Sequence, residues 1–376
     1  MAENSLSILL QTNTSAKDTL AEQWGIVLEN FQKGTISAMY KNTDLSGDPM
    51  AGVVQAKRFA NATSKTYGTA RAGRAGEKVK AKPVTVNIDD DDEFIEEVEE
   101  KDLLMYGVDG LISKRTQNQG SSMKRLFERR FFNKAVLGGT VKTLSGANIQ
   151  AKLEEIIQHL ETVQNDFVDG VDRADMCLVL DTATYGLART YLDSTQNANV
   201  NTSIAEFGIF HGVIVFSSVY LPATVNYLIF VKGSVAQPIR QNLYNPAKIE
   251  LSDATAFGMF LYSGTKVVTE DLIFFAGTIG AVTIASTYSG TTNTTTITVS
   301  SALSDTGNTF WYLKHATAVA EPTYGADATT AGYTKMTLTS GAQDILATSD
   351  TKIRVVEVDA SDRIIKTSAE TTIVKS

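Results

Sequence analysis

The chain has 376 residues, of which 43 % are hydrophobic and 20 % are charged, so it holds enough apolar material for one or two sizeable cores. Its formal net charge of -8 excludes a general electrostatic attraction to nucleic acid, and any contact with a polyanion has to be local. No window holds the roughly 18 apolar residues that a membrane-spanning helix needs, and the first residues lack the basic segment of a signal peptide. We therefore expect a soluble protein that is made in a cytoplasm.

The first 47 residues contain one amphipathic pattern, in which apolar side chains recur at helical spacing between Thr19 and Phe31. The pattern predicts a helix. It fits two roles equally well: an ordinary first helix of the fold, or an arm that docks on a neighbouring subunit.

Residues 57–82 form a basic segment that is rich in small and polar residues. Strand-like stretches at 52–59 and 79–88 predict that this region folds as a long exposed hairpin. A two-stranded hairpin is only marginally stable by itself, and the surface that would most easily support it is another subunit. Contact with phosphate groups explains its charge equally well. The candidate inter-subunit contacts here are Lys65, Arg71, Arg74, Lys78 and Lys80.

Residues 89–102 carry ten acidic side chains and one lysine. An acidic start suits the positive end of a helix dipole, and four apolar residues between Phe94 and Leu103 supply an apolar side, so we predict a helix. It is either a solvated surface or the partner of a neighbour's basic hairpin, where each exposed ion pair contributes about 0–1 kcal/mol. The acidic candidates for that contact are Asp90, Asp91, Glu96 and Glu97.

A helical stripe of large apolar residues runs from Val108 to Val136, with basic residues on the opposite side. A helix of this length extends about 40 Å and is a spine rather than a small packing element. Gly120 is a candidate interruption, and Gly138 with Gly139 is a typical helix end.

Residues 147–244 alternate between helical and strand patterns, which indicates a compact α/β layer. Cys177 lies in an apolar run and is expected to be a buried strand residue. Strand-like patterns return at 246–277 and close this body. The predicted elements are helices at 149–168 and 182–192 and strands at 176–180, 212–216 and 227–231.

Residues 280–376 differ in composition, because 22 of these 97 residues are threonine and no helical period occurs. Short alternating stretches predict a small, appended β-sandwich. The fold class of the whole chain is therefore α+β. The clearest predicted strands are 294–300, 309–314, 333–338 and 352–358.

The sequence carries no pattern that predicts catalysis. The three histidines, His159, His211 and His315, are expected on a helix, a strand and a strand, and none has a second metal ligand at a suitable spacing. Nucleophile-elbow, phosphate-loop, dinucleotide-binding and CxxC motifs are missing from the sequence, and the acid run lacks the ligand spacing of a calcium loop. We predict a protein that is not an enzyme, with no cofactor and no metal.

The order of these parts resembles the major capsid proteins of tailed bacteriophages. The stretch EFIEEVEEKDLLMYGVDGLISKRTQNQ, followed by SMKRLFERRFF, looks like the run into the spine helix of that fold. FVKGSVAQPIRQNLYNPAKIELSDATAFGMFLYSGTKVV looks like its late passage from the axial to the peripheral domain. The resemblance implies an N-arm at 1–47, an extended loop at 48–92, a peripheral domain at 93–146 and 245–279, an axial domain at 147–244, and an immunoglobulin-like sandwich at 280–376.

The resemblance also implies a function. The subunit would form the pentamers and hexamers of an icosahedral shell that encloses double-stranded DNA without sequence-specific binding. It would sit in the virion, be made in the host bacterial cytoplasm, and work with a separate scaffolding protein and a portal. Trp311, Tyr312 and Tyr324 of the terminal sandwich are either core residues, which we favour, or binding aromatics.

Three other functions stay open. An encapsulin-like compartment would use the same fold to hold a protein cargo. A β-rich surface adhesion protein would use the C-terminal part, although a signal peptide is missing. A hydrolase comes last, because no set of nucleophile, base and oxyanion donor can be assembled from the sequence.

Overall fold

The structure is a computed structural model, and it describes residues 35–45, 53–62, 79–99, 108–194, 208–243, 247–250, 252, 254–338 and 341–375. The helix predicted between Thr19 and Phe31 lies outside these residues. So do Lys65, Arg71, Arg74 and Lys78 of the basic segment.

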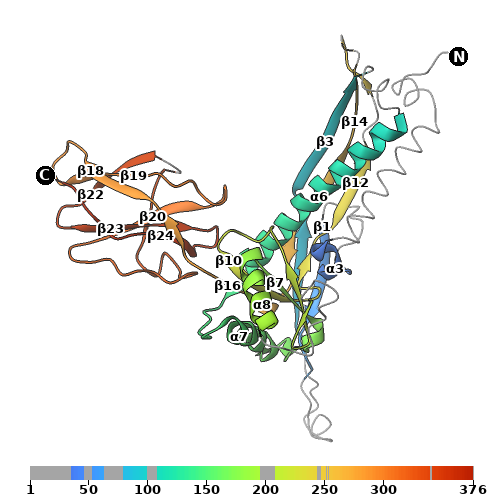
Figure 1. Ribbon diagram of the computed structural model, residues 1–376, viewed down its shortest axis with the longest axis horizontal. Coiled ribbons are helices and arrows are strands. Elements are labelled where there is room, and N and C mark those ends of the chain that lie inside the picture. The colour runs from blue at the N-terminus through green and yellow to red at the C-terminus, as the bar shows by residue number, and fades with distance from the viewer. Residues whose placement is uncertain are drawn as a thin grey trace, which may run out of the picture.

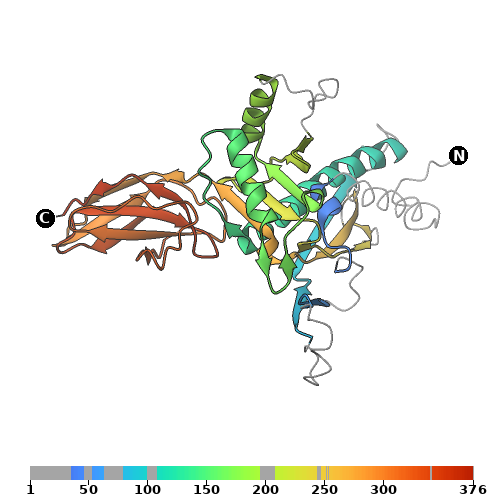
Figure 2. The ribbon, with the colours of Figure 1, turned by 90° about the horizontal axis from the view of Figure 1, so that it is seen from below.

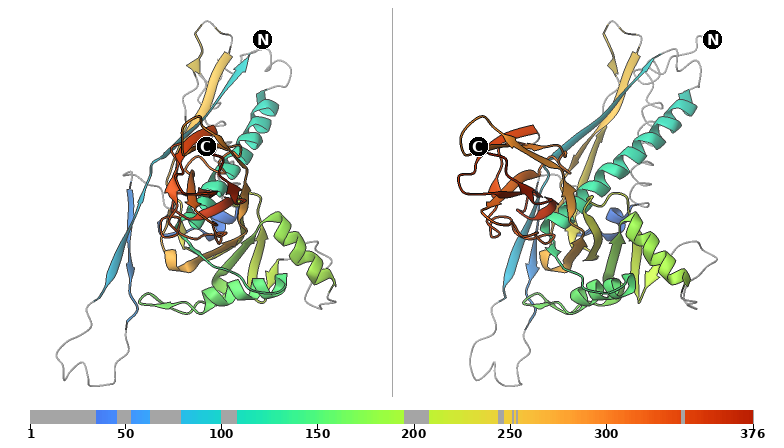
Figure 3. Two further views of the ribbon diagram at one scale, coloured as in Figure 1. Left: turned by 90° about the vertical axis from the view of Figure 1, so that its left-hand side faces the viewer. Right: turned by 60° about the vertical axis from the view of Figure 1, so that its left-hand side comes forward.

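The predicted hairpin is confirmed. Strands β1 (Val53–Phe59) and β2 (Ala81–Asn87) pair antiparallel, from Val53 opposite Asn87 to Phe59 opposite Ala81. Its base packs on the body, where Val84 and Val86 are buried with Leu45. From there the two strands run beside the body (Figure 3), and at their outer end the backbone N–H of Asn61 donates to the carbonyl of Asp166.

The acidic segment is a strand, so the predicted helix is wrong. Strand β3 (Asp90–Glu99) pairs along its whole length with β14 (Ala254–Ser263), from Asp90 opposite Ser263 to Glu99 opposite Ala254. A helix here would place like charges four residues apart, as with Glu93 and Glu97, which is destabilising. The sheet partner and the strand-favouring Phe, Ile and Val decide the outcome. Strands β12 (Ile239–Leu243) and β13 (Ala247–Lys248) complete this sheet on the other side of β14.

Helix α6 (Val108–Gly138) is the predicted spine, and Gly120 does not interrupt it. Its 31 residues extend about 45 Å, and Figure 1 shows it crossing the body beside β3 and β14. The helix ends where a side chain would not fit, because a Cβ on Gly138 would lie 2.7 Å from a methyl group of Val267. Its buried side holds Met123, Phe127, Phe131, Phe132 and Ala135.

A six-stranded sheet forms the centre of the body, in the order β4-β16-β10-β7-β9-β8. Its strands are β4 (Thr140–Val141), β16 (Ile273–Gly277), β10 (Val225–Val231), β7 (Met176–Leu180), β9 (Val213–Ser217) and β8 (Ile209–Phe210). Helices α7 (Ile149–Glu161) and α8 (Thr182–Ser194) cover one face, and α6 and the short α3 (Ile36–Tyr40) cover the other. Figure 2 shows this layering.

The alternation of side chains in β7 explains the two covered faces. Leu178 packs towards α7 and α8, whereas Cys177 and Val179 pack towards α6. All five residues of β7 are buried, so Cys177 is a buried strand residue as predicted. A strand buried on both faces is typical of a sheet between two helical layers.

Helix α7 ends at Glu161, seven residues before the predicted end. The chain turns into a small hairpin of β5 (Gln164–Asn165) and β6 (Val168–Asp169). The Asn165 side chain accepts hydrogen bonds from the backbone N–H groups of Phe167 and Val168 at 2.8 and 3.0 Å. Such a side-chain turn competes with helix continuation.

Two short strands and two single turns complete the body. The strands β11 (Val235–Ala236) and β15 (Lys266–Val267) pair with each other. The 3₁₀ turns are η1 (Arg173–Asp175) and η2 (Glu270–Leu272).

The C-terminal unit is β-structured, and no helix occurs among its described residues. One sheet has the order β17-β24-β23-β20-β21, with β25 also paired to β23, and a second has the order β18-β19-β22. The predicted strand at 333–338 is shorter than expected, covering only Thr334 and Lys335. The bounds are β17 (Gly280–Val282), β18 (Ile284–Tyr288), β19 (Thr294–Val299), β20 (Thr309–His315), β21 (Thr334–Lys335), β22 (Gly341–Leu346), β23 (Lys352–Val358), β24 (Ile364–Ser368) and β25 (Thr371–Thr372).

The two C-terminal sheets share a core. Ile297 from the second sheet and Phe310, Ile353 and Val355 from the first belong to one buried cluster. The unit extends to one side of the body (Figure 1).

Candidate inter-subunit contact sites

Arg58, opposite Lys82 near the outer end of the paired strands, ties the hairpin to the body. This side chain forms two hydrogen bonds to the Asp271 carboxylate, at 2.6 and 3.0 Å. Its guanidinium also lies over the Phe167 ring, 4.6 Å from the centroid, a geometry that adds cation–π attraction. Asn165 donates a further hydrogen bond of 2.6 Å to Asp271.

The partners of Asp271 favour its charged form. Burial opposes its ionisation, but the hydrogen bonds from Arg58 and Asn165 outweigh burial and hold the pKa of Asp271 below its usual value. The paired charges therefore fix the hairpin at the point where it leaves the body.

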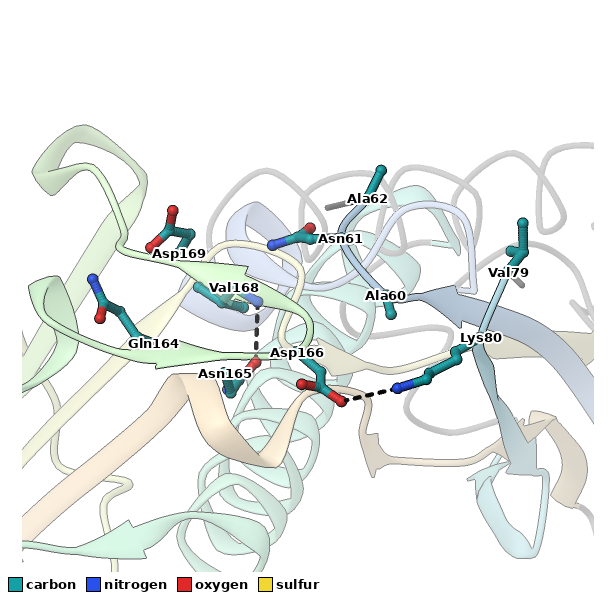
Figure 4. Close-up of a pocket in the computed structure, with 10 residues that line it drawn as sticks. All are labelled: Ala60, Asn61, Ala62, Val79, Lys80, Gln164, Asn165, Asp166, Val168 and Asp169. Carbon is teal, nitrogen blue, oxygen red and sulfur yellow. Dashed lines mark hydrogen bonds and ion pairs between the residues drawn. The ribbon is translucent and has the colours of Figure 1, made fainter. Parts of the chain in front are cut away.

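A cavity of about 440 Å³ lies beside this anchor, between the hairpin and the β5–β6 turn (Figure 4). The backbone N–H of Asn61 donates to the carbonyl of Asp166 at 2.9 Å, and Lys80 Nζ lies 3.8 Å from the carboxylate of Asp166. Lys80 and Asp166 are both about three-quarters exposed, so their ion pair contributes little. The cavity is open to solvent, so it forms part of a contact surface rather than an enclosed binding pocket.

Strand β3 carries its acids on two different faces. On the inner face, Arg130 of α6 pairs with Asp92 and lies 3.8 Å from Asp90. Arg130 also donates to Ser263 of β14 at 3.4 Å. The inner acids therefore hold α6 against the β3–β14 sheet.

The outer face of β3 consists of every second residue and points to solvent. Ile95 is 43 % exposed there, and the acids on either side of it are exposed as well: Asp91, Glu93, Glu97 and Glu99. We call these four side chains the acidic stripe.

The predicted contact residues fall into three groups. Asp91 and Glu97 belong to the exposed acidic stripe, whereas Asp90 is close to Arg130 of its own chain and Glu96 is half-buried. Lys80 lies at the hairpin cavity. The other four basic candidates are outside the described residues, so a contact between copies through these side chains stays a prediction.

The junction between the body and the C-terminal unit depends on Arg363, which the sequence analysis did not single out. Its guanidinium donates to the carbonyls of Val136, Leu137 and Gly139 at 2.9–3.1 Å. It lies 4.9 Å from the centroid of Phe275 and is held by Asp359 at 3.0 Å. Helix α6 has no basic residue in its own last turn, so Arg363 supplies the cation that suits the negative end of the helix.

Tyr324 makes a second contact at this junction. Its hydroxyl lies 3.2 Å from that of Thr224, and its ring packs edge-on against Phe275 at 6.4 Å between centroids. Beside it a cleft of about 650 Å³ separates the two parts of the chain. Of the three candidate aromatics, Tyr324 thus packs on the body, and Trp311 and Tyr312 pack against the two C-terminal core clusters.

The histidines occupy unrelated places. His159 lies on α7 as predicted, and His315 is the last residue of β20. His211 lies in the turn after β8 instead of a strand, with a left-handed φ of 46°, and its Nδ1 is 2.7 Å from Glu154. Hydrogen bonds from Arg173 and His211 hold the pKa of Glu154 at about 2. This cluster joins α7 to η1 and the turn.

Within the described ranges, no three His, Cys, Asp or Glu side chains come together as a metal site. Neither is any of the described helices both long and apolar enough to cross a membrane.

Comparisons with known proteins give one family match and several similar structures. Residues 288–375 match the model of the S-layer protein SbsC C-terminal domain. No curated protein matches the chain. This family match covers only the C-terminal unit and leaves the body unassigned.

Among solved structures, the chain is similar to one titled Mycobacterium phage Che8, at 17 % identity and a TM-score of 0.47 over 60 % of this chain and 84 % of that one. A capsid of the cyanophage P-SCSP1u is similar at 15 % identity and a TM-score of 0.48, over 65 % and 90 % of the two chains. A virus-like particle from Pyrococcus furiosus follows at 13 % identity and 0.45, over 68 % and 98 %. Similarity at this level does not assign the chain to a family.

Proposed function

We propose that this chain is a coat protein that assembles with copies of itself into a closed shell. The hairpin is the observation that carries the proposal. Its base is packed on the body and its outer end is anchored by Arg58, yet beside this anchor Phe59 and Val79 are 60 % and 80 % exposed. A hairpin of two strands needs a surface to lie on, and a second copy of the chain supplies one.

Charge complementarity supports a second copy as that surface. The basic segment at 57–82 holds eight basic residues and one acid. The acidic stripe of β3 is exposed on the same chain, so neighbouring copies present opposite charges to each other. Each such pair contributes little, but the contribution is repeated at every interface.

The arrangement of the body supports a structural role as well. A long helix crosses a three-layer body and is fastened in its C-terminal half by Arg130 and at its end by Arg363. These contacts make a stiff subunit. Arg58, Arg130 and Arg363 each hold two elements together, which suits a building block.

In the full proposal, the parts are those of the tailed-phage capsid fold. Residues 1–47 are the N-arm, 48–92 the extended loop, 93–146 and 245–279 the peripheral domain, 147–244 the axial domain and 280–376 an immunoglobulin-like domain. Strand β3 runs without a break across the boundary at 92 and 93, so the loop and the peripheral domain share one strand. The copies form pentamers and hexamers of an icosahedral virion shell around double-stranded DNA, with a separate scaffolding protein and a portal.

Negative-stain electron microscopy of the purified full chain, with sedimentation at low and high salt, tests the proposal. We expect closed uniform shells or capsomer-sized rings that weaken as salt screens the charged contacts. A monomer at every salt and protein concentration, even when co-expressed with its genomic neighbours, contradicts it. DNA inside particles from the native source supports a virion, and a protein cargo supports a compartment.

A further inference from the structure

Three side chains with complementary chemistry meet inside the C-terminal unit. Glu357 of β23 is fully buried, and Lys366 of β24 lies directly opposite it in the sheet. Asn308, which is 7 % exposed, immediately precedes β20 on the other side of β23. The sheet thus places an amine and a carboxamide on either side of one carboxyl group.

The contacts within this trio are short. Lys366 Nζ lies 2.9 Å from Glu357 Oε2, and Asn308 Nδ2 donates to Glu357 Oε1 at 2.7 Å. The ammonium is close to Oε2, yet that oxygen accepts no aligned hydrogen bond from the part of the chain that the structure describes. The contact is therefore an ion pair without an aligned hydrogen bond to Oε2 from the described residues.

Glu357 is shielded from water, and the Lys366 side chain is 18 % exposed. Phe310 lies opposite Glu357 on β20 and is fully buried in the core shared by the two sheets. Gly280 of β17 leaves space for the lysine stem, because a Cβ at that position would lie 2.7 Å from Lys366 Cγ. A side chain as short as alanine at residue 280 would push the lysine out of place.

We propose that Lys366 and Asn308 form an intramolecular isopeptide bond, with Glu357 as the proton-transfer group. Glu357 Oε2 accepts a proton from the Lys366 ammonium, and the free amine attacks Asn308 Cγ. The protonated Glu357 carboxyl group then donates to Nδ2 as the C–N bond to it breaks, and the attacking nitrogen loses its second proton to the released ammonia. The products are an amide between the two side chains and one ammonium ion, with Glu357 ionised again, so the chain loses the mass of one ammonia and the reaction needs no oxidant, reductant or cofactor.

Elementary chemistry explains why these three residues are suited to the step. Two reacting groups held by one carboxyl group gain the advantage of an intramolecular reaction. A carboxyl group that contacts both the nucleophile and the leaving group can serve as base and then as acid. A buried ion pair is costly to maintain, whereas an amide carries no charge.

The proposal concerns the C-terminal unit alone and does not depend on shell assembly. It is tested by the intact mass of the purified full chain. We expect a mass lower than that of the sequence by one ammonia. After trypsin, residues 267–314 and 364–375 should be recovered as one branched peptide, uncut after Lys366.

Variants identify the atoms involved. Lys366→Met and Glu357→Gln should show no mass loss, whereas Asn308→Asp should lose one water instead of one ammonia. Lys352→Met, which removes a lysine from the neighbouring strand β23, is the matched control and should keep the loss of ammonia.

Two results would overturn the proposal: a wild-type mass equal to that of the sequence with both peptides recovered separately, or an unchanged ammonia loss in Lys366→Met. The wild-type mass and peptides are measured without reference to the variants, so a variant that folds poorly does not affect the wild-type result.

Discussion

Single residues decide how the separate parts of this chain are joined. Arg58 fastens the hairpin, Arg130 fastens the long helix to the β3–β14 sheet, and Arg363 fastens the C-terminal unit. In each contact a planar guanidinium makes several hydrogen bonds at once, which a lysine cannot reproduce. None of these pairs was predicted from sequence, because the partners are far apart along the chain, as with Arg58 and Asp271, which are separated by 213 positions.

The Arg58–Asp271 pair makes the hairpin sensitive to acid. Since the pKa of Asp271 is held below its usual value in the folded chain, the pair stabilises the fold above that usual value. The stabilisation is lost as the pH falls through the lowered pKa. We expect Asp271→Asn to increase hydrogen exchange of β1 at neutral pH and to match the wild type in strong acid.

Asp169→Asn is the control for that experiment, because Asp169 is an exposed acid lining the same cavity. It should leave the exchange of β1 unchanged at every pH. Equal exchange in wild type and Asp271→Asn at neutral pH would contradict the role of the pair.

Arg363 predicts a second effect at the residue scale. Arg363→Ala removes three hydrogen bonds to backbone carbonyls at the end of α6 and should lower the free energy of unfolding by about 2 kcal/mol. Limited proteolysis should also cut the chain near 278–280 faster, because the C-terminal unit is released. Arg363→Lys should recover only part of the loss, and full recovery would show that charge alone matters.

At the scale of elements, sequence patterns predicted the helices and strands that are determined by interactions between residues close together in the chain. The hairpin, the long helix and strand β7 could be predicted because apolar periodicity and turn residues agree with their final environment. Strand β3 could not, because its ten partners in β14 lie more than 150 positions further along the chain. The early end of α7 depends on an asparagine turn that a helical period does not reveal.

Gly264 tests how tightly the elements fit where β14 ends beside β2. A Cβ at this position would lie 1.9 Å from the carbonyl oxygen of Asn87, so Gly264→Ala has to displace the hairpin base. We expect a loss of about 1–3 kcal/mol in the free energy of unfolding, measured by chemical denaturation.

Gly186→Ala provides the comparison, since Gly186 lies within α8 and a Cβ there meets nothing within 4 Å. Alanine favours a helix over glycine by about 0.5–1 kcal/mol, so this variant should be slightly more stable. If both variants had the same stability, the close approach of β14 and β2 would not constrain the fold.

For the whole molecule, the change of composition near residue 280 predicted a separate β-structured part, and the structure has two sheets with a shared core there. For contacts between copies, we propose that the hairpin of one copy meets the acidic stripe of another.

A charge exchange tests that contact. Reversal of Arg71, Arg74, Lys78 and Lys80 to Glu should abolish assembly, as measured by sedimentation, and leave the circular dichroism of the subunit unchanged. Replacing Asp91, Glu93, Glu97 and Glu99 by Lys in the same variant should restore assembly, since opposite charges then meet again. Normal particles from the first variant, or none from the combined one, would contradict the pairing.

The Arg363 junction has a practical consequence for any ordered array of this chain. Because the C-terminal unit is fastened to the end of α6, every copy would hold it at one fixed angle. The turn between β18 and β19, where Gly290 and Asn293 have left-handed backbones and Thr291 and Thr292 are exposed, would then repeat at regular intervals. A peptide epitope inserted there would be presented as an evenly spaced antigen, with the spacing set by the particle rather than by a flexible linker.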